Sequence, residues 1–264
     1  MVGEVAGDGA GMYIKLHMST TGSSATHGFV EVPELRDRVG VFRDRTHAGE
    51  VLAGMLANAL SPAALVLAIP AGGVPVGVEV ARRLNLKLEL AVVSKILIPG
   101  TTEAGYGAVA FDGTVRLNEP LVAALGLTEA AVEEGIAATR TRIARRVQLL
   151  RHGRPFPDLR NVAAVLVDDG LASGFTMRVA VEALRAGGAA EVIIAVPTGH
   201  LDAVRRLSPL VETLYCANVR GERSFAVADA YRSWSDVSEA EVQRILGARQ
   251  PASTQPSPAR SRAR

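Results

Sequence analysis

The sequence predicts an α/β protein built on a doubly wound parallel sheet with helices on both faces. Short apolar runs of strand length alternate with amphipathic stretches of helix length along most of the chain. The apolar runs are continuous, as in strands that are buried on both faces. In such sheets ligands bind beyond the carboxyl ends of the strands, so the residues that follow each predicted strand are the candidate functional residues.

The first half of the chain alternates helices, strands and loops. Its predicted elements are a helix over 48–60, a strand over 65–69, a helix over 75–84, a strand over 88–94, a loop over 95–107 and short strands near 108–111 and 115–117. Asp44 or Thr46 can cap the first helix, because a short polar side chain accepts a hydrogen bond from the first helical turn. Gly72 and Gly73 follow the first strand, and Lys95 follows the second.

The second half continues the alternation. Its predicted elements are a helix over 128–150, a strand over 161–167, a helix over 176–187, a strand over 192–196, a helix over 201–207, a strand over 211–216 and a final helix ending near 246. Gly187 and Gly188 stop the second of these helices. Ser238 stands before acidic residues and an apolar face, a pattern typical of a capped helix start.

Composition predicts one domain with two loose ends. The chain has 264 residues, 48% of them apolar, which is enough for one sizeable core. Residues 1–30 are rich in Gly, Ser and Thr and are predicted to be a mobile extension, and residues 250–264 form a Pro/Ser-rich tail with three arginines that is predicted to be disordered. The folded domain is expected over 41–247.

Charge and cysteine content exclude several classes of protein. The net charge is only +2, which predicts neither nucleic-acid nor membrane binding. The single cysteine, Cys216, rules out a disulfide framework or a thiolate metal site within one chain. No apolar run approaches the ~20 residues of a membrane span, and residues 1–30 lack the order of a secretory signal. A cytoplasmic protein is therefore expected.

The most informative stretch runs from 161 to 187. A Val-rich strand ends in Asp168 and Asp169, and a loop of small residues leads into a helix. Backbone N–H groups of such a loop, together with the helix dipole, favour a bound phosphate. Two acids beside an anion site fit a ligand that also carries hydroxyls and a metal ion, as a sugar phosphate does.

The run VLVDDGLASGFT over 165–176 resembles the phosphoribosyl pyrophosphate (PRPP) motif of type I phosphoribosyltransferases. By motif order the resemblance extends over 41–247. It implies a Mg²⁺-dependent transfer of 5-phosphoribosyl from PRPP to a nucleobase-like nitrogen acceptor, with release of diphosphate. It also implies a flexible lid over 96–105 and a small hood, about 215–247, that binds the acceptor.

The resemblance implies a role for each candidate residue. Asp168 and Asp169 would hold ribose hydroxyls and orient water on Mg²⁺, and Lys95 would neutralise the leaving diphosphate. The 5′-phosphate would lie against Gly170, Leu171, Ala172, Ser173, Gly174, Phe175 and Thr176. The diphosphate would lie against Ala71, Gly72 and Gly73, and the acceptor against Tyr231 and Trp234.

Two positions depart from the family pattern. Related sequences usually carry an arginine where this chain has Ala71, which puts the strength of diphosphate binding in question. Some members place a third carboxylate, proposed as a general base, where this chain has Ala172.

Two other functions stay open. One is a PRPP-sensing regulatory protein with the same fold, although no helix-turn-helix or basic helix is evident. The other is a hydrolase that releases diphosphate to water. The expected partners are PRPP and a nucleobase-like molecule; no membrane or nucleic acid is expected, and a homodimer is left open.

Overall fold

The computed structural model describes residues 28–101 and 104–248. Most of the expected N-terminal extension, the expected tail over 250–264 and Glu103 of the expected lid lie outside the described residues. Residues 29 and 30, which were expected to belong to the extension, form a short strand of the main sheet.

Six parallel strands form the main sheet, in the order β1-β9-β8-β7-β2-β3. Their bounds are β1 Phe29–Val30, β2 Leu65–Ala68, β3 Lys87–Leu90, β7 Ala163–Val167, β8 Glu191–His200 and β9 Thr213–Arg220. Neighbouring strands pair in register along their length, for example Val66 with Val165 and Val165 with Ile193. The predicted parallel α/β architecture is confirmed.

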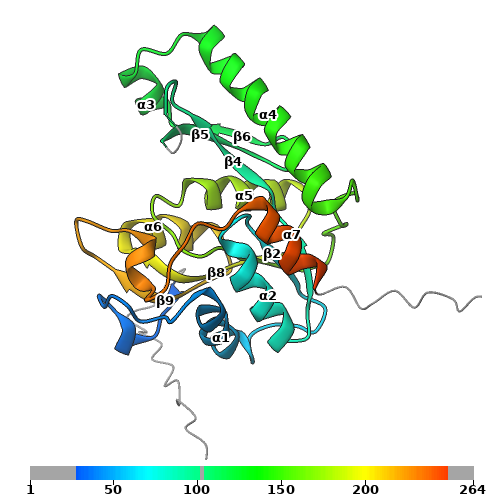
Figure 1. The fold of residues 1–264 in the computed structure, drawn as a ribbon, viewed down its shortest axis with the longest axis vertical. Coiled ribbons are helices and arrows are strands. Elements are labelled where there is room, and N and C mark those ends of the chain that lie inside the picture. The colour runs from blue at the N-terminus through cyan, green and yellow to red at the C-terminus, as the bar shows by residue number, and fades with distance from the viewer. Residues whose placement is uncertain (1–27, 102–103, 249–264) are drawn as a thin grey trace, which may run out of the picture.

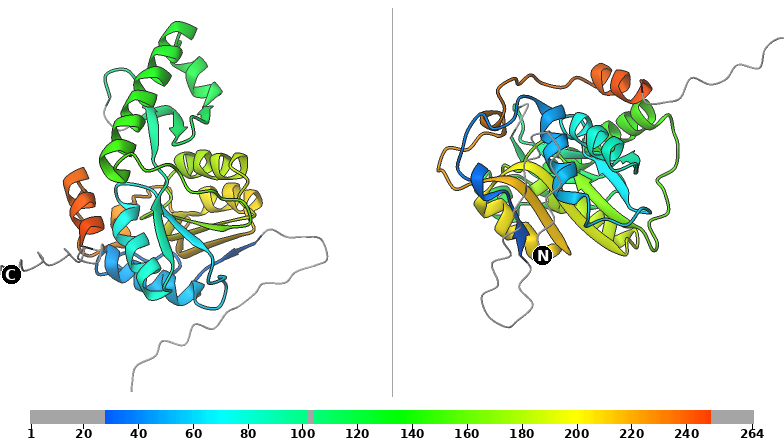
Figure 2. Two further views of the ribbon diagram at one scale, coloured as in Figure 1. Left: turned by 90° about the vertical axis from the view of Figure 1, so that its right-hand side faces the viewer. Right: turned by 90° about the horizontal axis from the view of Figure 1, so that it is seen from below.

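Helices cover both faces of this sheet (Figures 1 and 2). Helices α1, Arg45–Leu56, and α2, Gly73–Arg83, pack on one face, and α5, Phe175–Ala186, and α6, Leu201–Leu207, pack on the other. Successive strand residues serve opposite cores, because side chains alternate across a strand. In β7, Leu166 belongs to the core under α5 and α6, and Val165 belongs to the core under α1 and α2.

A second, smaller lobe stands at one end of the molecule (Figure 1). It contains the antiparallel sheet β4-β5-β6 and two helices. Their bounds are β4 Val93–Leu97, β5 Gly105–Ala110, β6 Val115–Leu117, α3 Glu119–Ala124 and α4 Glu129–Arg151. Helix α4 runs from the lobe back to the main body, where it meets the last helix, α7, Glu239–Gly247. Short 3-10 helices complete the fold: η1 Pro33–Leu35, η2 Ser208–Leu210 and η3 Val227–Ala230.

Helix starts agree with the local signals. Asp44, rather than Thr46, caps α1 by accepting a hydrogen bond from the His47 amide at 2.8 Å. Thr128 caps α4, and Ser238 caps α7. Within the described parts of the chain, no helix is both long enough and apolar enough to span a membrane.

Strand bounds differ from the expectation where the tertiary fold decides them. The predicted strand over 88–94 is two strands, β3 and β4, that belong to different sheets. The apolar run continues through Ala91 and Val92, both fully buried, so the sequence does not mark the point where the chain leaves the main sheet. Strands β8 and β9 extend to His200 and Arg220, well beyond the predicted ends. Tyr215 is therefore part of the main sheet, and the expected start of the hood there is wrong.

Candidate functional site

The site forms where the chain reverses its direction across the main sheet. Strand β2 is followed by β3 on one side, whereas its neighbour β7 is followed by β8 on the other side. The loops after β2 and β7 therefore diverge from adjacent strand ends and leave a crevice between them. The Ile69 amide donates to the carbonyl of Val167 at 2.8 Å, which joins the two loops at their base.

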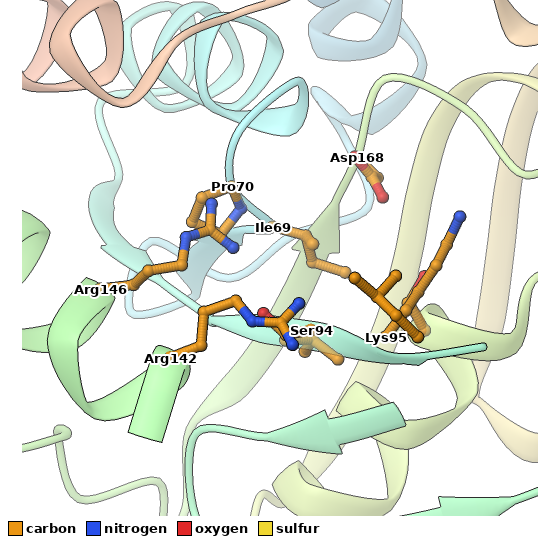
Figure 3. Close-up of a pocket in the computed structure, with 10 residues that line it drawn as sticks. Ile69, Pro70, Ser94, Lys95, Arg142, Arg146 and Asp168 are labelled. Carbon is orange, nitrogen blue, oxygen red and sulfur yellow. The ribbon is translucent and has the colours of Figure 1, made fainter. Parts of the chain in front are cut away.

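A cavity of about 400 Å³ opens between these loops and the smaller lobe (Figure 3). The two loops, strand β4 and helix α4 supply its walls. The lining residues are Ile69, Pro70, Val93, Ser94, Lys95, Leu97, Arg142, Arg146, Asp168 and Thr176. Three of them are cationic and one is a carboxylate, so the cavity suits an anionic ligand with a polar end near Asp168.

The two adjacent carboxylates face different surroundings. Asp168 lines the cavity, and its Oδ1 accepts a hydrogen bond from the Asp169 amide at 2.9 Å. Burial, followed by the neighbouring charge of Asp169, raises the pKa of Asp168 well above its usual value. Burial also raises the pKa of Asp169, and the cation of Arg45 opposes that shift. Both carboxylates therefore lie in a site that favours a bound cation.

Arg45 is a site residue that the sequence reasoning did not single out. Its Nε and Nη2 both lie 2.9 Å from Oδ2 of Asp169, and its Nη1 donates to the carbonyl of Ser235 at 2.8 Å. Its guanidinium carbon lies 3.8 Å from the centroid of the Trp234 ring, a cation–π contact. Its place directly after the Asp44 cap gave no local signal of a contact with a residue 124 positions away.

The predicted acceptor residues lie beside this ion pair. Tyr231 is buried, with 6% of its surface exposed, and its hydroxyl donates to the carbonyl of Asp169 at 2.7 Å. Its ring packs against that of Phe42 at 5.6 Å between centroids. Trp234 retains 36% exposure, and one side of its ring carries the Arg45 guanidinium. Of the two aromatic rings, only Trp234 is accessible to a ligand.

The glycine pair after β2 allows the two site loops to touch. A Cβ atom on Gly72 would lie 1.9 Å from Oδ2 of Asp169, and one on Gly73 would lie 2.6 Å from the carbonyl oxygen of Val167. Both distances are far below van der Waals contact, so both positions require glycine. The Gly73 amide donates to the carbonyl of Ile69, and the peptide bond between Pro70 and Ala71 is cis. The predicted diphosphate loop thus lies directly against the carboxylates.

The loop after β7 is anchored to β8 by backbone hydrogen bonds, and its middle is exposed. The Leu171 amide donates to the carbonyl of Thr198, and the His200 amide donates back to the carbonyl of Leu171, each at 2.9 Å. Leu171 is 2% exposed, so it anchors the loop and its amide is not available to a phosphate. Gly170 lies against Val227, which leaves no space for a Cβ atom.

The remainder of that loop is suited to an anion. Ala172 and Ser173 are exposed, and among the described residues no group accepts a hydrogen bond from their amides or from that of Gly174. Gly174 has φ of 71° and is the N-cap of α5, whose first turn has free N–H groups that suit an anion. Ser173 Oγ accepts from the Phe175 amide at 3.3 Å. Thr176 lines the same cavity as Asp168.

Lys95 reaches the cavity from an unexpected element. It was predicted to follow a strand of the main sheet directly, but it lies within β4 of the smaller sheet, where it pairs with Ala108. The side chain still lines the same cavity as Asp168. The expected element was wrong because the chain changes sheets at residues 91 and 92.

Two arginines of α4 were also missed by the sequence reasoning. Arg142 and Arg146 are one helical turn apart and both extend from α4 into the lining of the cavity (Figure 3). Arg146 pairs with Glu239 of α7, with Nε 2.9 Å from Oε1. The spacing of four residues was visible in the sequence, but nothing local indicated that this face of α4 meets the site.

The carboxylates fit Mg²⁺ brought by a phosphorylated ligand. Within the described residues, no group of three or more His, Cys, Asp or Glu side chains is arranged to hold a metal ion. Mg²⁺ commonly binds through one or two carboxylates together with substrate phosphates, and Asp168 and Asp169 supply the carboxylates. The site therefore fits a Mg²⁺ ion that the ligand helps to bind.

Known proteins resemble this chain in sequence and in fold. The family model for the phosphoribosyl transferase domain matches residues 58–212. Proteins from two Mycobacterium tuberculosis strains, H37Rv and CDC 1551, are each 37% identical over 206 residues, covering 78% of this chain and 46% of the relative, and carry the provisional name phosphoribosyl transferase. The chain thus spans about half the length of the curated relatives it matches.

A solved structure matches the fold. The crystal structure of a Thermus thermophilus protein is similar with a TM-score of 0.64 and 35% identity, covering 78% of this chain and 97% of that one.

Proposed function

Because the chain belongs to the phosphoribosyltransferase family, we propose that it transfers the 5-phosphoribosyl group of PRPP to a nucleobase-like nitrogen acceptor in the presence of Mg²⁺. The observation that carries this proposal is the cavity at the diverging loops, which brings Asp168, Thr176 and Lys95 together. A carboxylate, an anion-binding loop and a cation are the groups that a ribose bearing phosphates at both ends requires.

The chemistry sets three tasks for these residues. The bond between ribose C1 and the diphosphate oxygen breaks, the new bond forms between C1 and the acceptor nitrogen, and diphosphate leaves with the bonding electron pair. Positive charge develops on the sugar while negative charge develops on the leaving group. The protein must therefore hold the ribose, stabilise the diphosphate and present the acceptor in line.

We assign the ribose and metal contacts to the carboxylate pair. Asp168, which lines the cavity, would hold the ribose hydroxyls and Mg²⁺, and Asp169, oriented by Arg45, would be the second carboxylate. Bound Mg²⁺ would neutralise part of the diphosphate charge. Lys95, which lines the same cavity, would neutralise the same charge, and the loop of Ala71, Gly72 and Gly73 would supply backbone contacts to the diphosphate.

We assign the 5′-phosphate to the loop that begins α5. The free amides of Ala172, Ser173 and Gly174 and the hydroxyls of Ser173 and Thr176 supply donors at a helix N-terminus. Gly170, Leu171 and Phe175 shape this loop. Leu171 acts through its anchoring bonds to β8.

The acceptor assignment changes with the geometry. Trp234 is the proposed stacking surface because its ring is partly exposed, and Tyr231 supports it from the core. Ala172 offers no carboxylate as a base, so the proton released by the acceptor passes to the departing diphosphate or is retained by the substrate until release. We place the reaction in the cytoplasm and leave a homodimer open.

Product analysis tests the proposal. The protein is incubated with PRPP, Mg²⁺ and a panel of nucleobases and related nitrogen heterocycles, and products are identified by mass spectrometry. A nucleoside monophosphate and diphosphate in equal amounts are expected with at least one acceptor, and the Asp168→Asn variant should form neither. Ribose 5-phosphate and diphosphate without an acceptor would identify a hydrolase. PRPP binding without any turnover would identify a sensor.

A further inference from the structure

The diphosphate loop of this chain lacks a cation of its own, whereas helix α4 directs two into the same cavity. Ala71 carries only a methyl group, and Arg142 and Arg146 line the same cavity as Pro70, the residue before Ala71. We infer that Arg142 and Arg146 together bind the diphosphate of PRPP and supply the positive charge that the loop does not. This inference rests on the proposed function.

Their positions on α4 bring both guanidinium groups to one place. Residues four apart lie on the same face of a helix. In Figure 3 both side chains extend from α4 toward the strand and loop that carry Ser94 and Pro70. Asp168 lies farther along the same cavity. A ligand whose ribose lies at Asp168 therefore has space for its C1 substituent on the side of α4.

The charges of the two arginines favour an anion. Arg142 has no carboxylate partner among the described residues, and its only hydrogen bond there is a long one of 3.5 Å to Thr139. Arg146 shares its charge with Glu239, but its Nη groups are not part of that bond. Guanidinium groups bind phosphate oxygens through two parallel hydrogen bonds, so the pair can hold both phosphates of a diphosphate.

Helix α4, which carries both arginines, is held in place by buried residues on its neighbouring face. Thr139 is fully buried and Ile143 is 5% exposed, so the face next to the arginines is fixed in the core of the smaller lobe. The ion pair between Arg146 and Glu239 joins α4 to α7. Side chains on a fixed helix lose less freedom on binding than side chains on a loop, which strengthens the contact.

The test compares ligands that share only part of their structure. Arg142→Gln and Arg146→Gln are titrated calorimetrically with diphosphate, PRPP and ribose 5-phosphate, each with Mg²⁺. We expect each variant to bind diphosphate and PRPP about tenfold or more weakly, because a charge-assisted contact is lost. Affinity for ribose 5-phosphate should stay within about twofold, since it lacks the diphosphate. The matched control is Arg145→Gln, an exposed arginine on the same helix, which should bind all three ligands like the wild type.

Two further variants separate binding from folding. Glu239→Gln removes the acid that holds Arg146 and leaves both arginines in place, so diphosphate affinity should be kept or increased even if the contact between α4 and α7 weakens. Ala71→Arg combined with Arg142→Gln should regain most of the lost diphosphate affinity, because position 71 directly follows Pro70, which lines the same cavity as Arg142.

The outcomes distinguish this inference from the proposed function. Wild-type affinity for diphosphate in both arginine variants overturns the inference and leaves the proposed function standing. An equal loss for ribose 5-phosphate also overturns it, because the effect is then not on the diphosphate. Arginine-dependent diphosphate binding without any transfer product supports the inference and removes the transferase proposal.

Discussion

Arg45 holds Asp169 through two nitrogens, Nε and Nη2, each 2.9 Å from the same oxygen, Oδ2. The side chains are 10% and 16% exposed, so water screens this pair weakly. The same guanidinium covers one side of the Trp234 ring. One arginine thus sets the position of a site carboxylate and of the proposed acceptor surface.

Replacement of Arg45 should affect both functions. We expect Arg45→Gln to lower the free energy of unfolding by about 1–3 kcal/mol, because it leaves Asp169 buried without its partner. It should also weaken PRPP binding and change the fluorescence of Trp234, the only tryptophan. Arg45→Lys keeps the charge but not the two-nitrogen geometry, so its PRPP affinity should fall between those of Arg45→Gln and the wild type. PRPP affinity equal to wild type in both variants would show that Arg45 has only a structural role.

Replacement of Asp168 should remove function and increase stability at neutral pH. Burial raises the pKa of Asp168, so the carboxyl group of Asp168 binds its proton more tightly in the folded chain than in the unfolded chain. The group therefore favours folding at low pH and opposes it as the pH rises above its ordinary value of 3.8. In chelator, Asp168→Asn should be more stable than the wild type at pH 7, with the difference narrowing toward pH 4. Denaturant titrations between pH 4 and pH 7 measure the free energy of unfolding of both proteins. A difference that does not change with pH would contradict the raised pKa of Asp168.

Glycine at position 73 should be essential for the packing of the two site loops. A Cβ atom there would lie 2.6 Å from the carbonyl oxygen of Val167 and 2.8 Å from Cα of Asp168, both backbone atoms. We expect Gly73→Ala to lower the free energy of unfolding by about 1–3 kcal/mol through overpacking. Gly247→Ala is the control, because among the described residues no atom outside its own stretch of helix backbone lies within 4 Å of an added Cβ. Chemical denaturation of both variants checks the prediction, and equal stabilities would contradict it.

Trp234 should control the acceptor and not the sugar phosphate. Stacking of a base on an aromatic ring contributes about 1–3 kcal/mol, so Trp234→Ala should raise the acceptor KM roughly tenfold to a hundredfold. PRPP affinity should change little. Steady-state kinetics tests this, with the acceptor that product analysis identifies as the varied substrate. The Tyr231→Phe variant is measured in the same way for comparison. If Trp234→Ala lowers the Tm and leaves the acceptor KM unchanged, the ring is a core residue.

Local chemistry was enough to predict the centre of the fold and part of the site. The strand that ends at Val167, the acids after it and the helix that follows are encoded in one continuous stretch, and the caps Asp44 and Ser238 are local signals. The parallel sheet then places the loop of Gly72 and Gly73 beside them.

Contacts between distant segments could not be predicted. Arg45 and Asp169 are 124 residues apart, and the partners Arg146 and Glu239 are 93 apart. Their meeting depends on how α1, α4 and α7 pack, which no local pattern encodes. Lys95 was assigned to the wrong element for a related reason, since an uninterrupted apolar run suits one long strand as well as two short ones.

The charged residues that line the cavity come from both the main body and the smaller lobe. The carboxylates belong to the main sheet, whereas Lys95, Arg142 and Arg146 belong to the smaller lobe. A ligand whose ribose lies at the carboxylates and whose diphosphate lies at these cations would contact both the main body and the smaller lobe. Binding of such a ligand would therefore stabilise the contact between the smaller lobe and the main body. On heating, the ligand-bound protein should therefore unfold in one cooperative transition, in which the smaller lobe does not unfold before the main sheet.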